Sequence, residues 1–319
     1  MWEFSVFRGL GLLIRTWPFV LVRAAAHLAM AAALFAGAVA GALAGRTLAG
    51  LAGATQDGTL WGGAAGLVLA VALIALLRGR LLYRVTVPQL AVMVETLDGR
   101  PPSMGTGQLT AARSFVADRF SDQRGLLALH RLVRGVVRTS TGMVDGLLVD
   151  ILPLSALDRL VRATGAGLGL SRGLIEAVVL GHAMRVRFEN AWEAAHDGLV
   201  FYTQNARPMM TNALWLSLTG WALACLVALA VLSPVTGLLA VFPALPWCGP
   251  LAALLIGWVV KAALYDPFAL ACMMQLHLRL TEDQEPQPEW RGRLTQVSDK
   301  FRQLGERALG WRAGPAQDA

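Results

Sequence analysis

The sequence predicts an all-α, polytopic membrane protein with four transmembrane helices and cytoplasmic amphipathic helices. Hydrophobic residues make up 55% of the 319 residues and charged residues only 15%, whereas charged residues are about a quarter of a soluble protein. The mean hydropathy is +0.53. Four apolar stretches are close to or above the ~20 residues that a helix needs to cross the hydrocarbon core.

The expected spans are Pro18–Ala44, Leu60–Leu77, Ala213–Leu232 and Pro250–Leu276. The first ends in small residues that resemble a signal-peptidase site. Its apolar run is longer than a signal-peptide core, so we expect a retained span. The spans define four consecutive parts: an interfacial helix with a transmembrane hairpin (1–87), a cytoplasmic or membrane-surface amphipathic segment (88–207), a second transmembrane hairpin (208–280) and a cytoplasmic amphipathic tail helix (281–319).

The distribution of arginine predicts the orientation. Sixteen arginines lie in residues 78–212, and the tail carries seven basic residues, whereas the loop Ser233–Leu245 has no charge. Because basic residues stay on the cytoplasmic side, both termini are expected in the cytoplasm. The same rule explains the net charge of +7 without a nucleic-acid partner. Arginine outnumbers lysine, and Ala and Gly are abundant, which indicates a GC-rich bacterial genome and hence a bacterial inner membrane.

Amphipathic stripes fill the parts outside the spans. We interpret the glycine-rich stretch 165–173, which separates the two middle stripes, as a hinge. Two interpretations of the stripes stay open. The helices lie on the cytoplasmic leaflet, with their arginines among anionic lipids, or they pack on one another as a helical layer or an oligomer seam. Apolar residues recur at helical spacing in four sets: Phe4, Phe7, Leu10, Ile14, Trp17; Leu126, Leu129, Val133, Val136, Ser140, Met143, Leu147; Leu174, Val178, Gly181, Arg185, Phe188, Trp192, Ala195, Leu199, Tyr202; and Trp290, Leu294, Val297, Phe301, Leu304, Ala308, Trp311.

Glycines at four-residue spacing occur in both of the first two spans. They are Gly37, Gly41 and Gly45 in the first span and Gly62 and Gly66 in the second. Small residues four apart let helix backbones approach closely. The simplest interpretation is a contact between spans one and two, although a chain so rich in Gly and Ala also produces this spacing by chance.

The fourth span contains the charges that most need an explanation. Lys261 lies about 17 Å beyond Pro250 at 1.5 Å per residue, close to mid-membrane. In a regular helix Asp266 would lie about 140° around the axis from Lys261. Pro267 is expected to kink the helix, to free a carbonyl and to let the two charges converge on one polar cavity. Tyr265 lies one turn from Lys261, and Trp258 shares its face. The pair marks either a solute path or a buried lock on helix packing.

The first span adds a second polar pair, Arg23 and His27, one turn apart. Arg23 is near the cytoplasmic end, where its side chain can reach the interface. His27 lies a turn deeper. The two residues form either an interfacial pair or part of a proton relay.

Other chemistry has little support in the sequence. Cys225, Cys248 and Cys272 are isolated in or beside apolar segments, so neither a metal site nor a disulfide framework is indicated. The run "GAGLGL" fails the dinucleotide fingerprint. The run "AHDG" pairs a histidine with an aspartate but has no nucleophile beside it. No cofactor, metal or enzymatic activity is therefore expected.

The C-terminal third resembles the choline transporter-like family over roughly 100 residues. The similar segments are "AWEAAHDGLVFYTQNARPMMTNALWL" and, after a span and a short loop, "LIGWVVKAALYDPFALACMMQLHLRLTED". Asp266, Cys272, Glu282 and Asp283 occur in an order comparable to that of the family's last helix. The resemblance implies a transport function.

The leading hypothesis is transport or permeation of a small polar solute or ion. Four helices enclose little space, so a homo-oligomer or a membrane-protein partner would enlarge the path. The alternative is a non-transporting membrane scaffold or assembly factor that binds lipid or a partner through its amphipathic helices. A transporter would depend on Lys261 and Asp266, and a scaffold on the apolar stripes.

Overall fold

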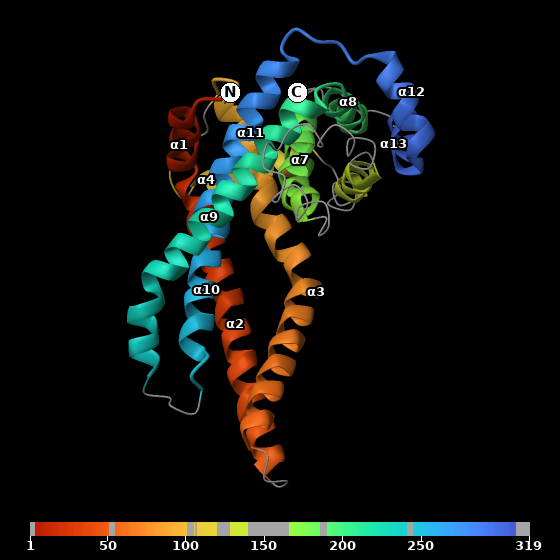
Figure 1. Ribbon diagram of the computed structural model, residues 1–319. Helices are drawn as coiled ribbons and strands as arrows, with labels where there is room; N and C mark the ends of the chain where they lie inside the picture. The colour runs from red at the N-terminus through yellow and green to blue at the C-terminus, as the bar shows by residue number, and fades with distance from the viewer. Residues whose placement is uncertain are drawn as a thin grey trace. The chain divides into compact units, whose positions relative to one another are not determined.

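The structure is a computed structural model that describes residues 4–50, 55–100, 105, 107–119, 128–139, 166–185, 190–240 and 245–310. These residues form helices joined by short connections, and no strand occurs among them (Figure 1). Four segments are long and apolar enough to cross a membrane: Trp17–Gly50, Asp57–Leu76, Ala206–Leu239 and Cys248–Thr281. The predicted fold class is therefore confirmed, and the chain is an integral membrane protein.

The chain divides into two compact units that each gather distant segments. Unit 2 consists of Trp17–Val87 and Thr219–Pro267, and unit 1 of Met1–Thr16, Pro88–Leu218 and Phe268–Ala319. The four consecutive parts expected from the sequence are thus regrouped. Two of the boundaries fall at a proline within a helical segment: Pro88 inside α3, beyond the candidate span, and Pro267 inside the last span. Proline removes a helix hydrogen bond and crowds the preceding turn, so a break in the packing is favoured there.

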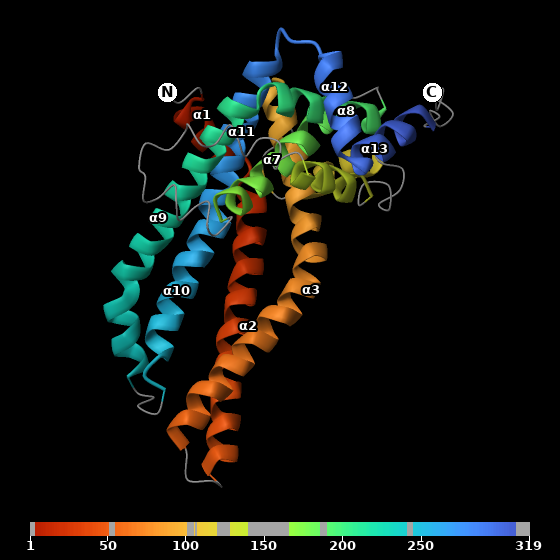
Figure 2. The same cartoon turned by 45° about the vertical axis from the view of Figure 1, so that its right-hand side comes forward.

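Unit 2 contains two helical hairpins (Figure 2). Helix α2 (Trp17–Gly50) runs beside the first part of α3 (Thr55–Leu97). The second hairpin pairs the last part of α9 (Ala206–Leu239) with α10 (Cys248–Val260), which continues into a π-helical turn, η1 (Lys261–Tyr265). Helix α2 also contacts α10 and η1, which places the first span beside the charged turn.

Glycines bring α2 and α3 into backbone contact. A Cβ added to Gly41 would lie 2.3 Å from the carbonyl oxygen of Gly62, and one added to Gly66 would lie 2.2 Å from that of Gly37. Gly45 meets Gly58 in the same way at 2.0 Å. All five glycines that the sequence analysis singled out lie in this contact, together with Gly58, which also fits the four-residue spacing but was not singled out. No other residue fits at such an approach.

Unit 1 has an apolar core of the kind found in soluble helical proteins. Five consecutive residues of α3, Leu90–Val94, are 0–2% exposed, so this end of the helix is covered on every side. The same holds for the first turns of α11 (Asp266–Thr281), where Ala269–Met274 are 0–3% exposed. Around them lie α1 (Val6–Arg15), α4 (Gly107–Arg119), a helix over residues 128–139, α7 (Ala166–Arg185), α8 (Ala191–Gln204), α12 (Pro288–Val297) and α13 (Asp299–Gly310).

Most described members of three of the four predicted stripes are buried in protein, with exceptions such as Arg185 and Val297. Leu129, Val133 and Val136 of the first middle stripe are fully buried, and Arg131, Arg134 and Arg138 lie on the exposed side. Leu126, Ser140, Met143 and Leu147 lie outside the described residues. In the second middle stripe, the buried members are Val178, Gly181, Ala195, Leu199 and Tyr202.

Two local expectations were wrong. The glycine-rich stretch is no hinge over its described residues, because Gly167, Gly169 and Gly173 lie inside α7. Interior glycine costs only about 1 kcal/mol, and the fully buried Ile175, Val178 and Val179 hold this helix in place.

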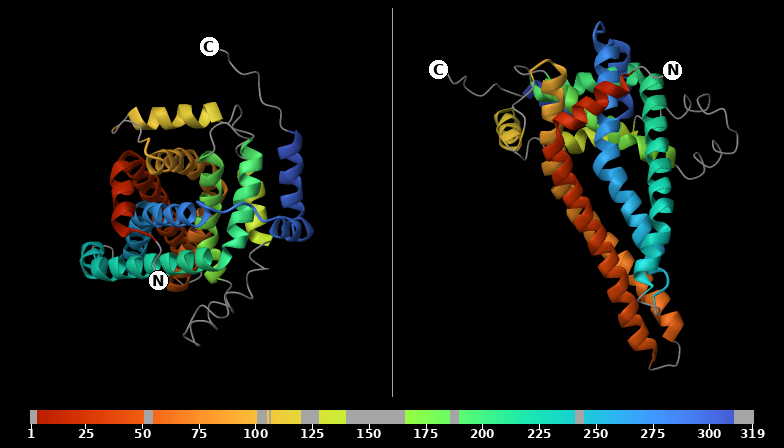
Figure 3. Two further views of the ribbon diagram at one scale, coloured as in Figure 1. Left: turned by 90° about the horizontal axis from the view of Figure 1, so that it is seen from above. Right: turned by 90° about the vertical axis from the view of Figure 1, so that its left-hand side faces the viewer.

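The tail is two helices rather than one, and the break falls at Ser298. Its hydroxyl accepts a hydrogen bond from the backbone N–H of Phe301 and so caps α13. The two helices pack beside α8 (Figure 3), with Leu294, Phe301 and Leu304 at most 1% exposed.

Candidate functional site

The candidate site is built around the π-helical turn at Lys261–Tyr265. The backbone N–H of Asp266 donates to the carbonyl of Lys261, five residues back instead of four. Pro267 follows and has no N–H, so continuation of this register leaves the carbonyl of Ala262 without its backbone donor. Single π turns inside α-helices are frequent at functional sites. The sequence predicts a disturbance at Pro267, and the structure shows its form.

The π turn brings Lys261 and Asp266 together. The Lys261 Nζ donates to the Asp266 Oδ1 at 2.7 Å. In a regular α-helix these residues would lie about 140° apart. The wider turn places residues i and i+5 on nearly the same side, because they share a backbone hydrogen bond. The side chains are 14% and 32% exposed, so the carboxylate is the more accessible partner.

Arg23 of α2 completes the cluster from a second helix. Its Nε donates to the carbonyl of Ala262 at 2.8 Å, the carbonyl that Pro267 cannot serve. Its Nη2 lies 4.0 Å from the Asp266 Oδ2, so each carboxylate oxygen faces one cation. Arg23 is 13% exposed. It therefore stabilises both the unusual backbone and the partly exposed carboxylate, whereas the sequence suggested an interfacial pair with His27 or a proton relay.

His27 and Trp258 lie together one turn from this cluster. The His27 Nδ1 is 2.8 Å from the Arg23 carbonyl oxygen, within its own helix. The His27 ring meets the Trp258 ring edge to face, with centroids 5.4 Å apart. His27 is buried. The arrangement ties α2 to α10 and places Trp258 against His27.

Three residues of α9 join the site without any signal that the sequence pattern supplied. The Trp221 ring lies under Lys261, with the Nζ 5.0 Å from the ring centroid. The Thr219 hydroxyl hydrogen-bonds the Tyr265 hydroxyl. Gly220 has no side chain, and a Cβ there would lie 2.7 Å from the Tyr265 ring. The useful signal would have been a Thr-Gly-Trp run in an otherwise aliphatic span.

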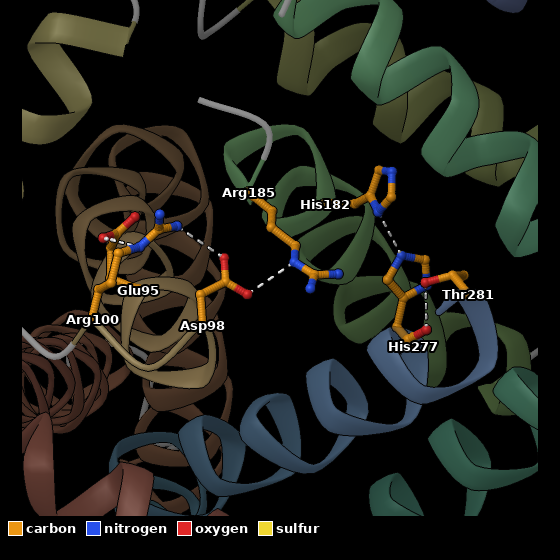
Figure 4. Close-up of polar contacts among 7 residues, drawn as sticks. All are labelled: Glu95, Asp98, Arg100, His182, Arg185, His277 and Thr281. Carbon is orange, nitrogen blue, oxygen red and sulfur yellow. Dashed lines mark hydrogen bonds and ion pairs between the residues drawn. The ribbon is translucent and has the colours of Figure 1, made fainter. Parts of the chain in front are cut away.

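A second polar cluster lies in unit 1 and contains no candidate from the sequence (Figure 4). The His277 Nε2 on α11 is 3.1 Å from the His182 Nδ1 on α7, and the two rings are nearly perpendicular. The Thr281 hydroxyl donates to the His277 carbonyl at 2.9 Å. Burial lowers the pKa of His182 to about 4, with a further lowering from the positive charge of Arg185 and an opposing effect of Asp197. His182 is therefore uncharged at neutral pH.

Beside the histidines, ion pairs join the end of α3 to α7. The Arg185 Nε donates to the Asp98 Oδ1 at 2.9 Å, and Arg100 lies 3.4 Å from the other Asp98 oxygen and 3.6 Å from Glu95 (Figure 4). Arg185 and Arg100 are 41% and 52% exposed. Pairs with such exposure contribute at most about 1 kcal/mol each. Over the described ranges, no group of three His, Cys, Asp or Glu side chains is placed to hold a metal ion.

Protein-family models, curated proteins and solved structures give no match to this chain. The site is accordingly interpreted from its own geometry, and the resemblance of the C-terminal third to the choline transporter-like family stays a prediction.

Proposed function

We propose that unit 2 conducts or transports a small polar solute or ion, with Lys261, Asp266 and Arg23 as its binding site. The observation that carries this proposal is a charged cluster built on a π turn inside a span. A charge at mid-membrane costs at least about 2.5–3.5 kcal/mol, and such charges commonly mark a solute path.

The accessibility of the cluster supports the proposal. Asp266 is 32% exposed, although each of its oxygens faces a cation. A polar solute or a proton that reaches this carboxylate competes with Lys261 and Arg23 for it. The cations then gain freedom to move, and Trp221 provides a face on which the ammonium of Lys261 can remain while the carboxylate is occupied.

The alternative is a non-transporting scaffold in which the cluster only locks the helices. One observation favours it: unit 1 collects three separate segments around a core of buried, mostly apolar side chains. Such a unit presents a stable surface to a partner. In that case the cluster only has to hold the helices together, and no solute has to reach it.

The experiment compares Lys261→Met, Asp266→Asn and the double variant in proteoliposomes. Asp266→Asn removes the carboxylate that faces both Lys261 and Arg23, and loss of one partner of a buried pair costs about 3–5 kcal/mol in soluble proteins, so its folded yield in detergent should fall furthest. Lys261→Met leaves Asp266 facing Arg23 and should lose less. The double variant should regain part of the yield lost by Asp266→Asn, because only Arg23 then lacks the carboxylate and its Nε keeps the bond to the Ala262 carbonyl. Vesicles loaded with a mixture of potassium chloride, choline and amino acids are then assayed for release by mass spectrometry and ion electrode.

We expect the wild type to release at least one of these solutes faster than protein-free vesicles, and the folded double variant to lose that release. Equal release from both would assign the pair to helix packing. No release from the wild type would favour the scaffold. Additive losses of yield in the double variant would contradict the pairing itself.

A further inference from the structure

Helix α1 is the exception among the predicted amphipathic helices. Over the described residues, the middle and tail stripes are largely covered by protein. On α1 the apolar side chains face outward: Phe7 is 87% and Ile14 68% exposed, and Val6 and Leu10 are 45% and 42% exposed. The same sequence pattern therefore has two outcomes, burial against protein and an exposed apolar face.

The face of α1 that packs on protein is narrow and involves few residues. Leu12 and Thr16 are buried, and a Cβ on Gly9 would lie 2.9 Å from the Cys272 sulfur and 3.1 Å from the Phe268 ring, both on α11. Ser5 caps the helix, accepting from the Arg8 backbone N–H. Helix α1 is thus held against unit 1 by one face, in a defined rotation.

That rotation separates three faces. At about 100° per residue, Val6, Leu10, Ile14 and Phe7 cover an arc of roughly 100°, and the packed face lies about 140° from its centre. Arg8 and Arg15 are both exposed and lie together on the remaining side, about 80–100° beyond the Phe7 edge of the apolar arc. An apolar arc with arginines on a separate side is the pattern of helices that lie in a membrane interface.

The chain itself brings α1 to a membrane. Helix α1 ends at Arg15 and α2, a candidate span from its first residue, begins at Trp17. One residue joins them, and consecutive Cα atoms are 3.8 Å apart. The end of α1 is therefore within a few ångström of the point where the first span starts.

We propose that the outer face of α1, formed by Val6, Phe7, Leu10 and Ile14, is inserted in the boundary between headgroups and acyl chains of an anionic bilayer, with Arg8 and Arg15 on lipid phosphates. A second copy of the chain is the competing occupant. Four side chains on a ten-residue helix are a small surface beside the ~800 Å² per partner of a standard protein interface. The first candidate span begins two residues after the end of α1, which favours the bilayer as the occupant.

The test places single nitroxide labels on the full-length protein in vesicles. The background carries Cys225→Ser, because Cys225 is exposed, whereas Cys248 and Cys272 are buried. Labels at Phe7→Cys and Ile14→Cys report on the proposed face, and Arg8→Cys reports on the arginine side. The control is Val297→Cys on α12, which is 48% exposed in the same unit. Collision with oxygen, which is enriched in lipid, is compared with collision with a water-soluble nickel complex.

We expect the oxygen-to-nickel ratio at residues 7 and 14 to exceed that at residues 8 and 297 several-fold. It should rise further when phosphatidylglycerol is added to phosphatidylcholine vesicles, and that rise should disappear in Arg8→Gln/Arg15→Gln. A water-like ratio at residues 7 and 14 would overturn the proposal. Spin–spin broadening between labels at residue 7, abolished by dilution with unlabelled protein, would assign the face to a second copy. Insensitivity to phosphatidylglycerol would remove the anionic lipid from the proposal.

Discussion

The two units hold their helices together by opposite means. In unit 2, α2 meets α3 through glycine backbones, and large apolar side chains such as Trp61 and Leu69 point away from the protein. In unit 1, large side chains such as Phe301 and Leu199 are fully buried. Apolar side chains gain no hydrophobic free energy by moving from lipid into protein, so helices in a membrane associate by close packing. In unit 1, burial of apolar surface from water supplies the stability.

The polar side-chain pairs of the two units also differ, because one is charged and the other is not held by opposite charges. Unit 2 contains a charged pair, Lys261 and Asp266, with Arg23 beside it. Unit 1 contains His182 and His277, of which His182 is held uncharged by its surroundings. A charged pair is costly to break one partner at a time. An uncharged His182 is instead sensitive to a pH low enough to charge it.

The largest effect is expected where backbones touch in unit 2. Gly41→Leu would place its Cβ 2.3 Å from the Gly62 carbonyl oxygen, so α2 and α3 must separate. We expect a loss of more than ~3 kcal/mol, at the upper end of overpacking effects. The control Gly237→Leu lies in the same unit, with nothing within 4 Å of its added Cβ. Unfolding in increasing dodecyl sulfate, followed by circular dichroism, measures both. Equal stability of the two variants would refute the backbone contact.

A smaller effect is expected on lowering the pH, and it belongs to unit 1. Because the pKa of His182 is lowered to about 4 in the folded protein from about 6.5 in the unfolded chain, the unfolded chain takes up the proton first. His182 therefore leaves the free energy of unfolding unchanged well above pH 6.5 and lowers it as the pH drops towards 4. Between pH 7 and 5 the loss from this group is about 2 kcal/mol.

Thermal unfolding in detergent at several pH values measures this loss. His277, Arg185 and Asp197 also surround His182, and other groups titrate elsewhere, so the comparison needs a matched variant. His182→Gln keeps a hydrogen-bonding group towards His277 but does not titrate. It should have the smaller decrease between pH 7 and 5. The same decrease in both proteins would show that His182 does not carry the pH dependence.

The sequence predicted what depends on local pattern. The spans follow from composition and length, and the stripes identify the inward faces of the helix over 128–139, α7, α8 and α13. What covers a stripe is not encoded in its spacing, so lipid and protein could not be distinguished for α1 and α13. The break at Ser298 was readable, since Ser-Asp is a common start of a helix. The glycines of α7 led to the wrong prediction of a hinge, because tertiary packing overrides their low helix propensity.

The charged site shows the same limit. Pro267 predicted a disturbed helix, and Lys261 and Asp266 were identified as a pair because both lie in one predicted span. Arg23 was selected for its position in the first span, but its bond to the Ala262 carbonyl depends on a π turn that spacing alone does not specify. Trp221 comes from a third helix and was missed altogether, because nothing local to α9 connects it with Lys261.

Trp221 therefore gives the last and smallest test of how unit 2 holds its charges. The Lys261 Nζ lies 5.0 Å from the ring centroid, and a cation–π contact of this kind contributes roughly 0.5–2 kcal/mol. Trp221→Leu should lose about 1 kcal/mol, and the same change in a Lys261→Met background should lose less, since the cation has gone. Dodecyl sulfate unfolding of the four proteins gives the coupling energy. Trp61→Leu, at a ring that is 77% exposed in the same unit, is the control for loss of a tryptophan from the surface. A coupling energy of zero would mean that the ring only fills space beside Lys261, and would leave Asp266 and Arg23 as the groups that set the depth of the lysine in the span.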